Sequence, residues 1–321
     1  MHHSVPFSRN HLADFLTLVT ENARFRWPEV TYLMNSDVAW RLPFSSPEKT
    51  LRLWYDDSGL AAYAWFSPVT QSVFDLRCSD FSESTLFFDI MNWLEYKQNQ
   101  FPASYPWLLG LRSMEEWEDA LTNDLMKQPY DRRLLQVSAL DADEKRKEAL
   151  SKLGFKPTDH FQYALTRSLS EPVEAAPVPP GFSVRSVAEA ESEERVATHR
   201  DAWFKSGFSL EQYRQVRAID LFEPELDLVA DNGSGEFGAY CIGWLDRDLG
   251  IGSFEPVGTR PHYRRLGLGR AVNLEGLRRM RNMGMHSAKI GTAGFNDRAF
   301  GLYKSCGFQL RDKDRTWVKE L

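Results

Sequence analysis

The chain has 321 residues, enough for two domains of ordinary size, and its hydrophobic content of 42% allows each to form a core. A net charge of −6 gives no general attraction to nucleic acid or to an anionic membrane, so neither is expected as a partner. No apolar run approaches the roughly 18 residues of a membrane span, and the first residues lack the layout of a secretory signal. Because Cys78, Cys241 and Cys306 show no CxxC spacing, we expect no disulfide framework and no metal site, and the cytoplasm is the expected location.

The N-terminal half shows three strand patterns in succession, followed by a helical pattern. The strands are expected at Thr50 to Tyr55, Leu60 to Phe66 and Val73 to Arg77, and the helix at about Glu83 to Gln98. Near the end of this half, Glu148 to Phe155 predicts a helix that stops at a glycine and leads into a short pair of strands.

A proline-rich stretch lies near the middle of the chain. Its prolines fix φ and remove backbone donors, so residues 170–180 favour an extended linker over packed structure. We therefore expect two domains, at residues 1–169 and 181–321.

The C-terminal half reads as alternating strands and helices, which predicts a mixed α/β domain. Strands are expected at Phe182 to Val187, Leu226 to Ala230, Phe237 to Leu245, Leu249 to Thr259 and Ala288 to Gly291, with two more at the end of the chain. Helices are expected at Glu189 to Lys205, Leu210 to Ala218, after Gly267, and from about Asn296 to Cys306. Asp231 to Gly235 should form a hairpin turn, and Pro256 predicts an edge or a bulge in its strand.

The two halves close with the same pattern, a helix followed by Gly-Phe and a strand, and both show three strands before a helix. This similarity predicts an internal duplication, the alternative being two unrelated endings of the same type. The N-terminal stretch Cys78 to Glu83, where the C-terminal half has its arginine-glycine loop, contains no glycine and carries only acidic charge. The N-terminal copy is therefore expected to hold no diphosphate cofactor.

Glycines and arginines combine between a predicted strand and the helix after it. The first turn of a helix presents unpaired N–H groups and about half a positive charge, and glycine lets a ligand approach the backbone closely. Gly267 and Gly269, flanked by Arg264, Arg265 and Arg270, therefore predict a pyrophosphate seat. A Rossmann loop would need a third glycine where Val272 stands, and the Gly-Lys-Ser/Thr of a Walker loop is absent.

The stretch from Val257 to Ala271 resembles the acetyl-CoA signature of the GNAT superfamily of N-acetyltransferases, R/Q-x-x-G-x-G/A after a strand and an x-Pro turn. Asn296-x-x-Ala299-x-x-Leu302-Tyr303-x-x-x-Gly307-Phe308 is similar to the second motif of that family. The detailed match covers roughly Phe182 to Leu321. With the degenerate N-terminal copy, the whole chain resembles a tandem GNAT protein, which implies two α/β domains, each a mostly antiparallel sheet flanked by helices.

The resemblance implies acetyl-CoA as acyl donor, with no metal. Two splayed central strands would admit the cofactor, and the pantetheine arm would pair with the backbone of Val257, Gly258 and Thr259. The pyrophosphate would be bound by Arg264 and by the amides of the segment Arg265, Leu266, Gly267, Leu268, Gly269 and Arg270. Asn296 would contact the arm, cap its helix, or do both.

Transfer from a thioester requires a neutral amine, so a base within reach of the acceptor is expected. Glu255, beside Pro256, is the candidate base, and partial burial would raise its pKa; the alternative is an ordinary strand carboxylate. Tyr303 lies where the family often has the tyrosine that protonates the leaving thiolate, and it is also a candidate cofactor contact or a core aromatic. The predicted activity is N-acetyl transfer to a small-molecule or peptide amine, the alternative being a module that binds acyl-CoA without turnover. The oligomeric state is left open.

Overall fold

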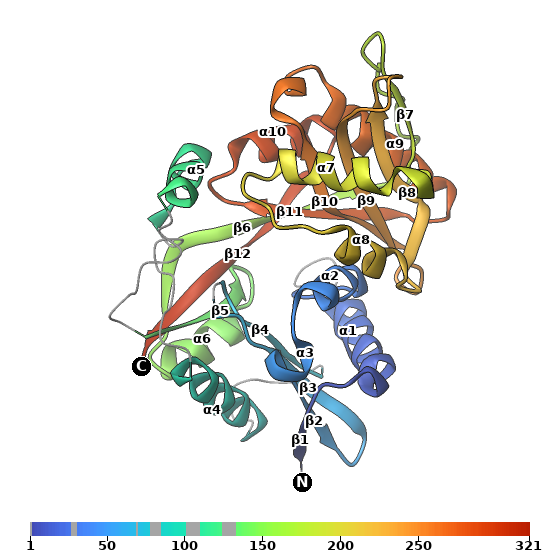
Figure 1. Cartoon of the computed structure of the whole chain (residues 1–321). Helices are drawn as coiled ribbons and strands as arrows, with labels where there is room; N and C mark the ends of the chain where they lie inside the picture. Colours follow the sequence, from blue (N-terminus) through green and yellow to red (C-terminus); the bar gives the residue numbers. More distant parts are fainter. Residues whose placement is uncertain (1, 27–30, 69, 78–84, 101–109, 124–132) are drawn as a thin grey trace.

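The computed structural model describes residues 2–26, 31–68, 70–77, 85–100, 110–123 and 133–321. Each half follows the order strand, two helices, three strands, helix, strand, helix, strand (Figure 1). The N-terminal half consists of β1 (His3–Pro6), α1 (Leu12–Arg26), α2 (Asn35–Arg41), α3 (Pro47–Thr50), β2 (Leu51–Asp56), β3 (Gly59–Trp65), β4 (Val73–Leu76), α4 (Thr85–Asn99), α5 (Met114–Thr122), β5 (Leu134–Leu140), α6 (Glu144–Lys152) and β6 (Lys156–Ser168). The C-terminal half consists of β7 (Ser183–Ser186), α7 (Ser192–Ala202), α8 (Leu210–Arg217), β8 (Phe222–Asp231), β9 (Phe237–Asp246), β10 (Ile251–Thr259), α9 (Leu268–Asn282), β11 (Ser287–Ala293), α10 (Asp297–Ser305) and β12 (Gln309–Glu320). The predicted duplication of element order is confirmed, with the short helices α3 and α5 added in the first half.

Local sequence signals account for where the C-terminal elements begin and end. The turn at residues 231–235 joins β8 and β9 as an antiparallel hairpin, as predicted. Asn296 accepts a hydrogen bond from the Ala299 N–H at 3.0 Å and so caps α10. After α10, Gly307 has a φ of 82° and ends the helix in the left-handed region. Helix α7 ends at Ala202, before the predicted Lys205.

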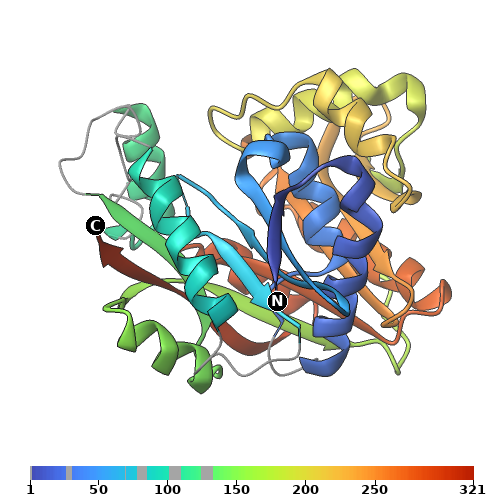
Figure 2. The same cartoon turned by 90° about the horizontal axis from the view of Figure 1, so that it is seen from below.

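The two halves exchange their last strands. The larger sheet has the order β5-β12-β6-β11-β10-β9-β8-β7, and the smaller has the order β1-β2-β3-β4. Strand β6 comes from the N-terminal half but pairs with β11 over Gln162 to Ser168. Strand β12 ends the chain but pairs with β5, Asp314 lying opposite Leu140 and Glu320 opposite Leu134. Figures 1 and 2 show both strands running from one half of the molecule to the other.

The predicted short strand pairs at the end of each half are therefore wrong. The chain forms one strand of 13 residues in β6 and one of 12 residues in β12. A pair would require β12 to turn back beside β11, but that place is occupied by β6. β12 instead continues through two register shifts and lies between β6 and β5 in the larger sheet.

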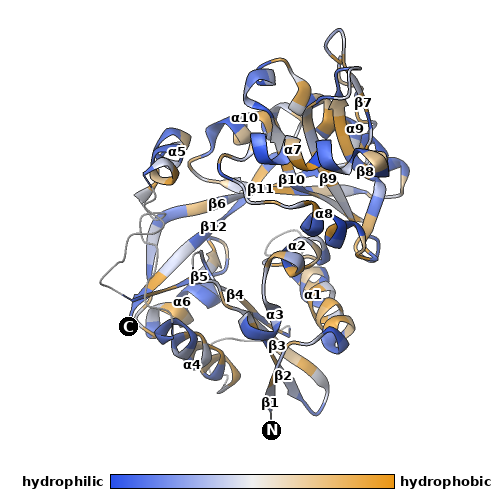
Figure 3. Ribbon diagram, viewed as in Figure 1, coloured by the Kyte–Doolittle hydropathy of each residue, from blue (hydrophilic) through white to orange (hydrophobic). Residues whose placement is uncertain are grey.

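The two crossing strands each contribute a side chain to a core of the other half. The C-terminal core gathers α9 against β8, β9 and β10 and takes in Leu165 from β6. The N-terminal core packs α4 and α6 against the strands and takes in Trp317 from β12. In Figure 3, hydrophobic and hydrophilic residues alternate around α1, which buries Phe15, Leu18 and Val19 along one face. Of the helices in the described ranges, none combines the length and the apolarity needed to cross a membrane.

The proline-rich stretch between β6 and β7 forms neither helix nor strand. It does not stand free of the protein, because Leu169 and Val173 are 2% and 7% exposed and belong to the C-terminal core. The division of the chain into two domains, residues 1–169 and 181–321, joined by a linker at 170–180, stays a prediction. In three dimensions, strand pairing and core packing cross that boundary in both directions.

Candidate active site

Strands β10 and β11 separate part of the way along their length. They pair in parallel at three positions, the last of which places Ser253 opposite Lys289. β10 pairs with β9 on its other side and shifts register between Phe254 and Val257, which confirms the bulge predicted at Pro256. In the described chain, the residues of β10 beyond Ser253 therefore have no partner on the β11 side. This fork is the separation of central strands that the resemblance implied.

The segment from Arg265 to Arg270 presents a row of backbone N–H groups at the start of α9. Gly267 is the residue before the helix and has a φ of 87°, in the left-handed region that glycine tolerates best. The first bond that the helix forms is from the Ala271 N–H to the Gly267 oxygen, at 3.0 Å. Among the described residues, no acceptor is found for the amides of residues 265–270. An anion can bind such a row without displacing an existing hydrogen bond.

The three predicted arginines differ in how far the protein already engages them. Arg264 donates to the Thr259 and Ala202 carbonyls, both at 3.4 Å, and Arg270 donates to the Ser305 carbonyl at 3.2 Å. Arg265 is exposed, and across the ranges that the structure describes its guanidinium has neither a hydrogen bond nor an ion pair. Arg265 is thus the arginine of this loop that is most available to a ligand.

Gly269 keeps the helix close to the predicted pantetheine strand. A Cβ at this position would lie 3.1 Å from the Thr259 hydroxyl and 3.3 Å from a Leu302 methyl group. The glycine therefore lets α9 start directly against the end of β10 and against α10. The structure brings the predicted loop, strand and second-motif helix together at one place.

Glu255 lies in the bulge of β10 and is half-buried. Burial raises the pKa of its carboxyl to about 7, and the negative charge of Asp37 acts in the same direction, while Arg41 and Lys289 oppose the rise. Its backbone oxygen accepts a hydrogen bond of 2.7 Å from the Trp244 indole. A carboxyl with this pKa can accept a proton near neutral pH.

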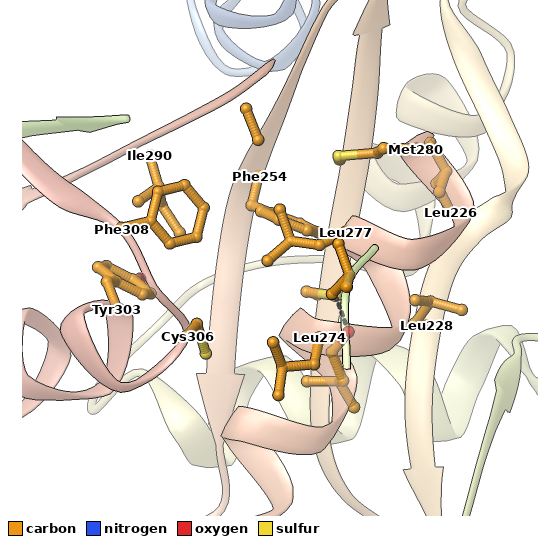
Figure 4. Close-up of a cluster of buried hydrophobic side chains, with 14 of the residues drawn as sticks. Leu226, Leu228, Phe254, Leu274, Leu277, Met280, Ile290, Tyr303, Cys306 and Phe308 are labelled. Carbon is orange, nitrogen blue, oxygen red and sulfur yellow. Dashed lines mark hydrogen bonds between the residues drawn. The ribbon is translucent and has the colours of Figure 1, made fainter. Parts of the chain in front are cut away.

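Tyr303 lies on α10, with 6% of its surface exposed. Figure 4 shows it on the same side of β10 as Ile290, Cys306 and Phe308. Burial, with smaller contributions from Cys306 and Glu255, raises the pKa of the phenol above its ordinary value, so the hydroxyl carries its proton at neutral pH. The position fits both a proton donor and a core aromatic.

Asn296, Cys306 and His199 have structural explanations. Asn296 is a helix cap, as one of its two predicted roles required, and its contact with the cofactor stays a prediction. Burial raises the pKa of the Cys306 thiol to about 11, so it packs as a neutral side chain and is no nucleophile. His199 is 7% exposed and bonded to the Tyr240 hydroxyl at 2.8 Å, and burial lowers its pKa to about 3. In the part of the chain that the structure describes, no three His, Cys, Asp or Glu residues form a group able to hold a metal ion.

Helix α2 lies against the strands of this site, although no sequence pattern indicated it. This helix of the N-terminal half contacts β9 and β10, and its Asp37 forms an ion pair with Lys289 of β11 at 3.2 Å. Trp40 of the same helix packs against Phe208 of the C-terminal half. None of these residues belongs to a recognisable motif, so no signal in the sequence connects them to Glu255. The stretch Cys78 to Glu83, from which the lack of a cofactor in the N-terminal copy was predicted, lies outside the described residues.

Comparison with known proteins agrees with this arrangement. Residues 187–308 match the model of the acetyltransferase (GNAT) family. The mycothiol acetyltransferase of Paenarthrobacter aurescens (strain TC1) is 26% identical over 176 residues, which cover 52% of this chain and 54% of that relative. That of Nocardiopsis dassonvillei is 32% identical over 113 residues, covering 33% of this chain and 34% of the relative. The chain thus spans about half the length, or less, of these curated relatives.

Solved structures resemble the chain over almost its whole length. A GCN5-related N-acetyltransferase from Sphaerobacter thermophilus has a TM-score of 0.64 at 15% identity and covers 99% of this chain and 95% of its own. A tandem GNAT protein from the clavulanic acid biosynthesis pathway has a TM-score of 0.60 at 12% identity and covers 100% of this chain and 98% of its own. These likenesses establish the fold. The chain therefore carries a GNAT-family acetyltransferase domain at residues 187–308, within a tandem GNAT fold.

Proposed function

We propose that this protein moves an acetyl group from acetyl-CoA to a primary amine, by direct attack of the amine in a ternary complex. The observation that carries the proposal is a carboxyl with a pKa of about 7, Glu255, at a strand fork that also meets the unpaired amides of residues 265–270. The family of residues 187–308 supports acetyl transfer as the class of reaction. The free amides supply a seat for a diphosphate, and the fork supplies an unpaired strand edge for the amide groups of a pantetheine arm.

The chemistry follows from the two titratable groups at the fork. An alkylammonium has a pKa near 10.4, so fewer than about one molecule in a thousand is neutral at pH 7. Glu255 takes a proton from the ammonium, directly or through a water, and the freed lone pair attacks the thioester carbonyl. Attack forms the C–N bond, and the C–S bond breaks as the tetrahedral adduct collapses, with Tyr303 giving its proton to the departing thiolate. The nitrogen returns its surplus proton to the Tyr303 phenolate through water, and Glu255 releases the first proton to solvent. Coenzyme A and the N-acetylated amine are the products.

A small molecule is the acceptor class that we favour over a peptide amine. The curated relatives are named mycothiol acetyltransferases, a name that refers to a small molecule. We infer an acceptor of the same general class here, a soluble primary amine, without assigning its identity. The proposed acyl donor is acetyl-CoA, to be compared directly with longer acyl-CoA species.

Release of free thiol from acetyl-CoA across a panel of primary amines tests the proposal. We expect turnover with at least one small-molecule amine, and a kcat/KM that rises with pH through about 7, because the base acts in its deprotonated form above its pKa. Tight binding of coenzyme A without turnover on any amine would instead support a module that senses acyl-CoA.

Reversing the charge of Arg265 is expected to weaken binding of coenzyme A by about 10- to 100-fold, since a hydrogen bond to a charged group contributes about 1.5–3 kcal/mol. Isothermal titration calorimetry of Arg265→Glu with coenzyme A measures this loss. Arg9→Glu makes the same charge change at an exposed residue of the N-terminal half and should leave the affinity unchanged. If Arg265→Glu and wild type bound coenzyme A with equal affinity, the diphosphate would not bind at this loop.

Tyr303→Phe is expected to lower kcat by about 10-fold or more, because a positioned proton donor contributes about 10²- to 10⁴-fold and water replaces part of that effect. Binding of coenzyme A should change little, since the ring keeps its place in the core. Single-turnover kinetics separate the chemical step from binding. An unchanged kcat would assign Tyr303 to packing alone.

A further inference from the structure

We propose that helix α2 of the N-terminal half is part of the active site, and that its Asp37, held by Lys289, is a positioning residue for the Glu255 carboxyl. The inference rests on the proposed role of Glu255 as base. It gives the N-terminal half a part in the chemistry, although that half lacks the glycine-arginine loop of the C-terminal half.

Asp37 is held from two directions. One of its oxygens, Oδ2, accepts a hydrogen bond of 2.7 Å from the Met34 N–H and lies 3.2 Å from the Lys289 ammonium. The side chains of Asp37 and Lys289 are 17% and 16% exposed, so this pair is only partly screened by water. The carboxylate is thus fixed in place, with its charge close to the fork.

The ion pair lies where the two strands of the fork part. Lys289 is opposite Ser253 in the last paired position of β10 and β11, and Glu255 follows Ser253 by two residues. Helix α2 also packs in the same cluster as Trp244, the residue that hydrogen-bonds to the Glu255 backbone. Ala39 of α2 belongs to the same hydrophobic cluster as Trp244, and the Trp244 indole donates to the Glu255 oxygen at 2.7 Å. The helix and the bulge of β10 therefore share one rigid support.

The charges that act on the Glu255 carboxyl come from α2 and β11. Asp37 on α2 raises its pKa, and Arg41 on α2 and Lys289 on β11 lower it, while burial is the largest cause of the rise. The Tyr303 phenol on α10 faces the same region and is neutral at pH 7. Asp314 on β12 interacts with the same two cations, and burial raises its pKa to about 6. In this arrangement, Asp37 and Lys289 act on Glu255 with opposite signs.

Two substitutions separate this role from simple packing. Asp37→Asn removes the negative charge and frees the Lys289 cation, and its amide oxygen can still accept from Met34. Both electrical effects favour ionised Glu255, so its pKa should fall. Lys289→Met removes the cation and leaves Asp37 unpaired, so the pKa of Glu255 should rise. A purely structural ion pair would change stability without these opposed shifts.

The test is a carbon-13 NMR titration of the glutamate carboxyl groups in the full chain. Glu255→Gln identifies the Glu255 signal by its loss. We expect a midpoint near pH 7 in wild type, a fall of about half a unit or more in Asp37→Asn, and a rise of similar size in Lys289→Met. Asp57→Asn, the same charge change at an exposed turn of the N-terminal half, should leave the midpoint in place. Circular dichroism confirms that each variant is folded.

Midpoints that do not move, or that move in the same direction in both variants, would overturn the proposal. So would an Asp37→Asn variant that raises KM for the amine with the Glu255 midpoint unchanged, since Asp37 would then contact the acceptor itself. The titration needs no turnover, so it distinguishes this inference from the proposed function. Opposed shifts in a protein that transfers no acetyl group would uphold the coupling and reject the reaction.

Discussion

Glu255→Gln is expected to lower kcat for acetyl transfer by about 10²- to 10⁴-fold, the contribution of a positioned general base. Glutamine keeps the shape of the side chain but cannot take a proton from the ammonium. The Glu255 side chain is not part of the proposed diphosphate seat, so affinity for coenzyme A should remain that of wild type. Steady-state kinetics with the best amine of the panel, together with calorimetric titration of coenzyme A, measure the two quantities.

The pH dependence gives this substitution a second readout. In wild type, kcat/KM should rise through about pH 7 as the Glu255 carboxyl loses its proton, and this limb should be missing in Glu255→Gln. Glu189→Gln, at an exposed carboxyl of the same half, is the matched control and should retain both rate and profile. A Glu255→Gln enzyme with wild-type kcat and an unchanged acid limb would show that another group is the base.

Trp317→Ala is expected to lower the free energy of unfolding by about 3–5 kcal/mol, the usual cost of removing a large aromatic side chain from a core. Trp317 is 6% exposed and packs in the N-terminal core, although only four residues follow it in the given sequence. Its register partners are Val137 of β5 and Pro157 of β6. Urea denaturation followed by circular dichroism measures the change.

Tyr96→Ala is the matched control for that substitution. Tyr96 lies on α4 of the N-terminal half and is 60% exposed, so its removal should cost less than about 1 kcal/mol. A similarly small effect of Trp317→Ala would mean that β12 does not complete the N-terminal core. The exchange of strands between the two halves would then be wrong.

Most elements of the C-terminal half could be predicted, because local patterns determine them. The continuous apolar run of β9, the glycine turn before β9 and the apolar repeat of α9 each act within about one element. The bulge at Pro256 was also predictable, since proline cannot donate to a strand ladder. The proposed cofactor loop has the same local character, because its glycines and arginines are neighbours in sequence.

The endings of both halves were not predictable in this way. The residues of β12 have a strand pattern whether they turn back beside β11 or continue to β5, because side-chain alternation does not specify the partner strand. The correct partner depends on β6, which occupies the place beside β11 from more than 100 residues away in sequence. The packing of Val173, from the predicted linker, against the C-terminal core also depends on residues that are distant in sequence.

For the candidate site, the sequence by itself determined the amide row at Gly267 and the candidate base and acid, Glu255 and Tyr303, as a proposal. Each belongs to a short motif whose chemistry is local. Only the tertiary structure placed Asp37 and Lys289 beside Glu255, since these residues lie on an unremarkable helix and strand and meet across 252 positions of sequence. A pKa depends on burial and on nearby charges in space, and neither quantity can be read from the sequence alone.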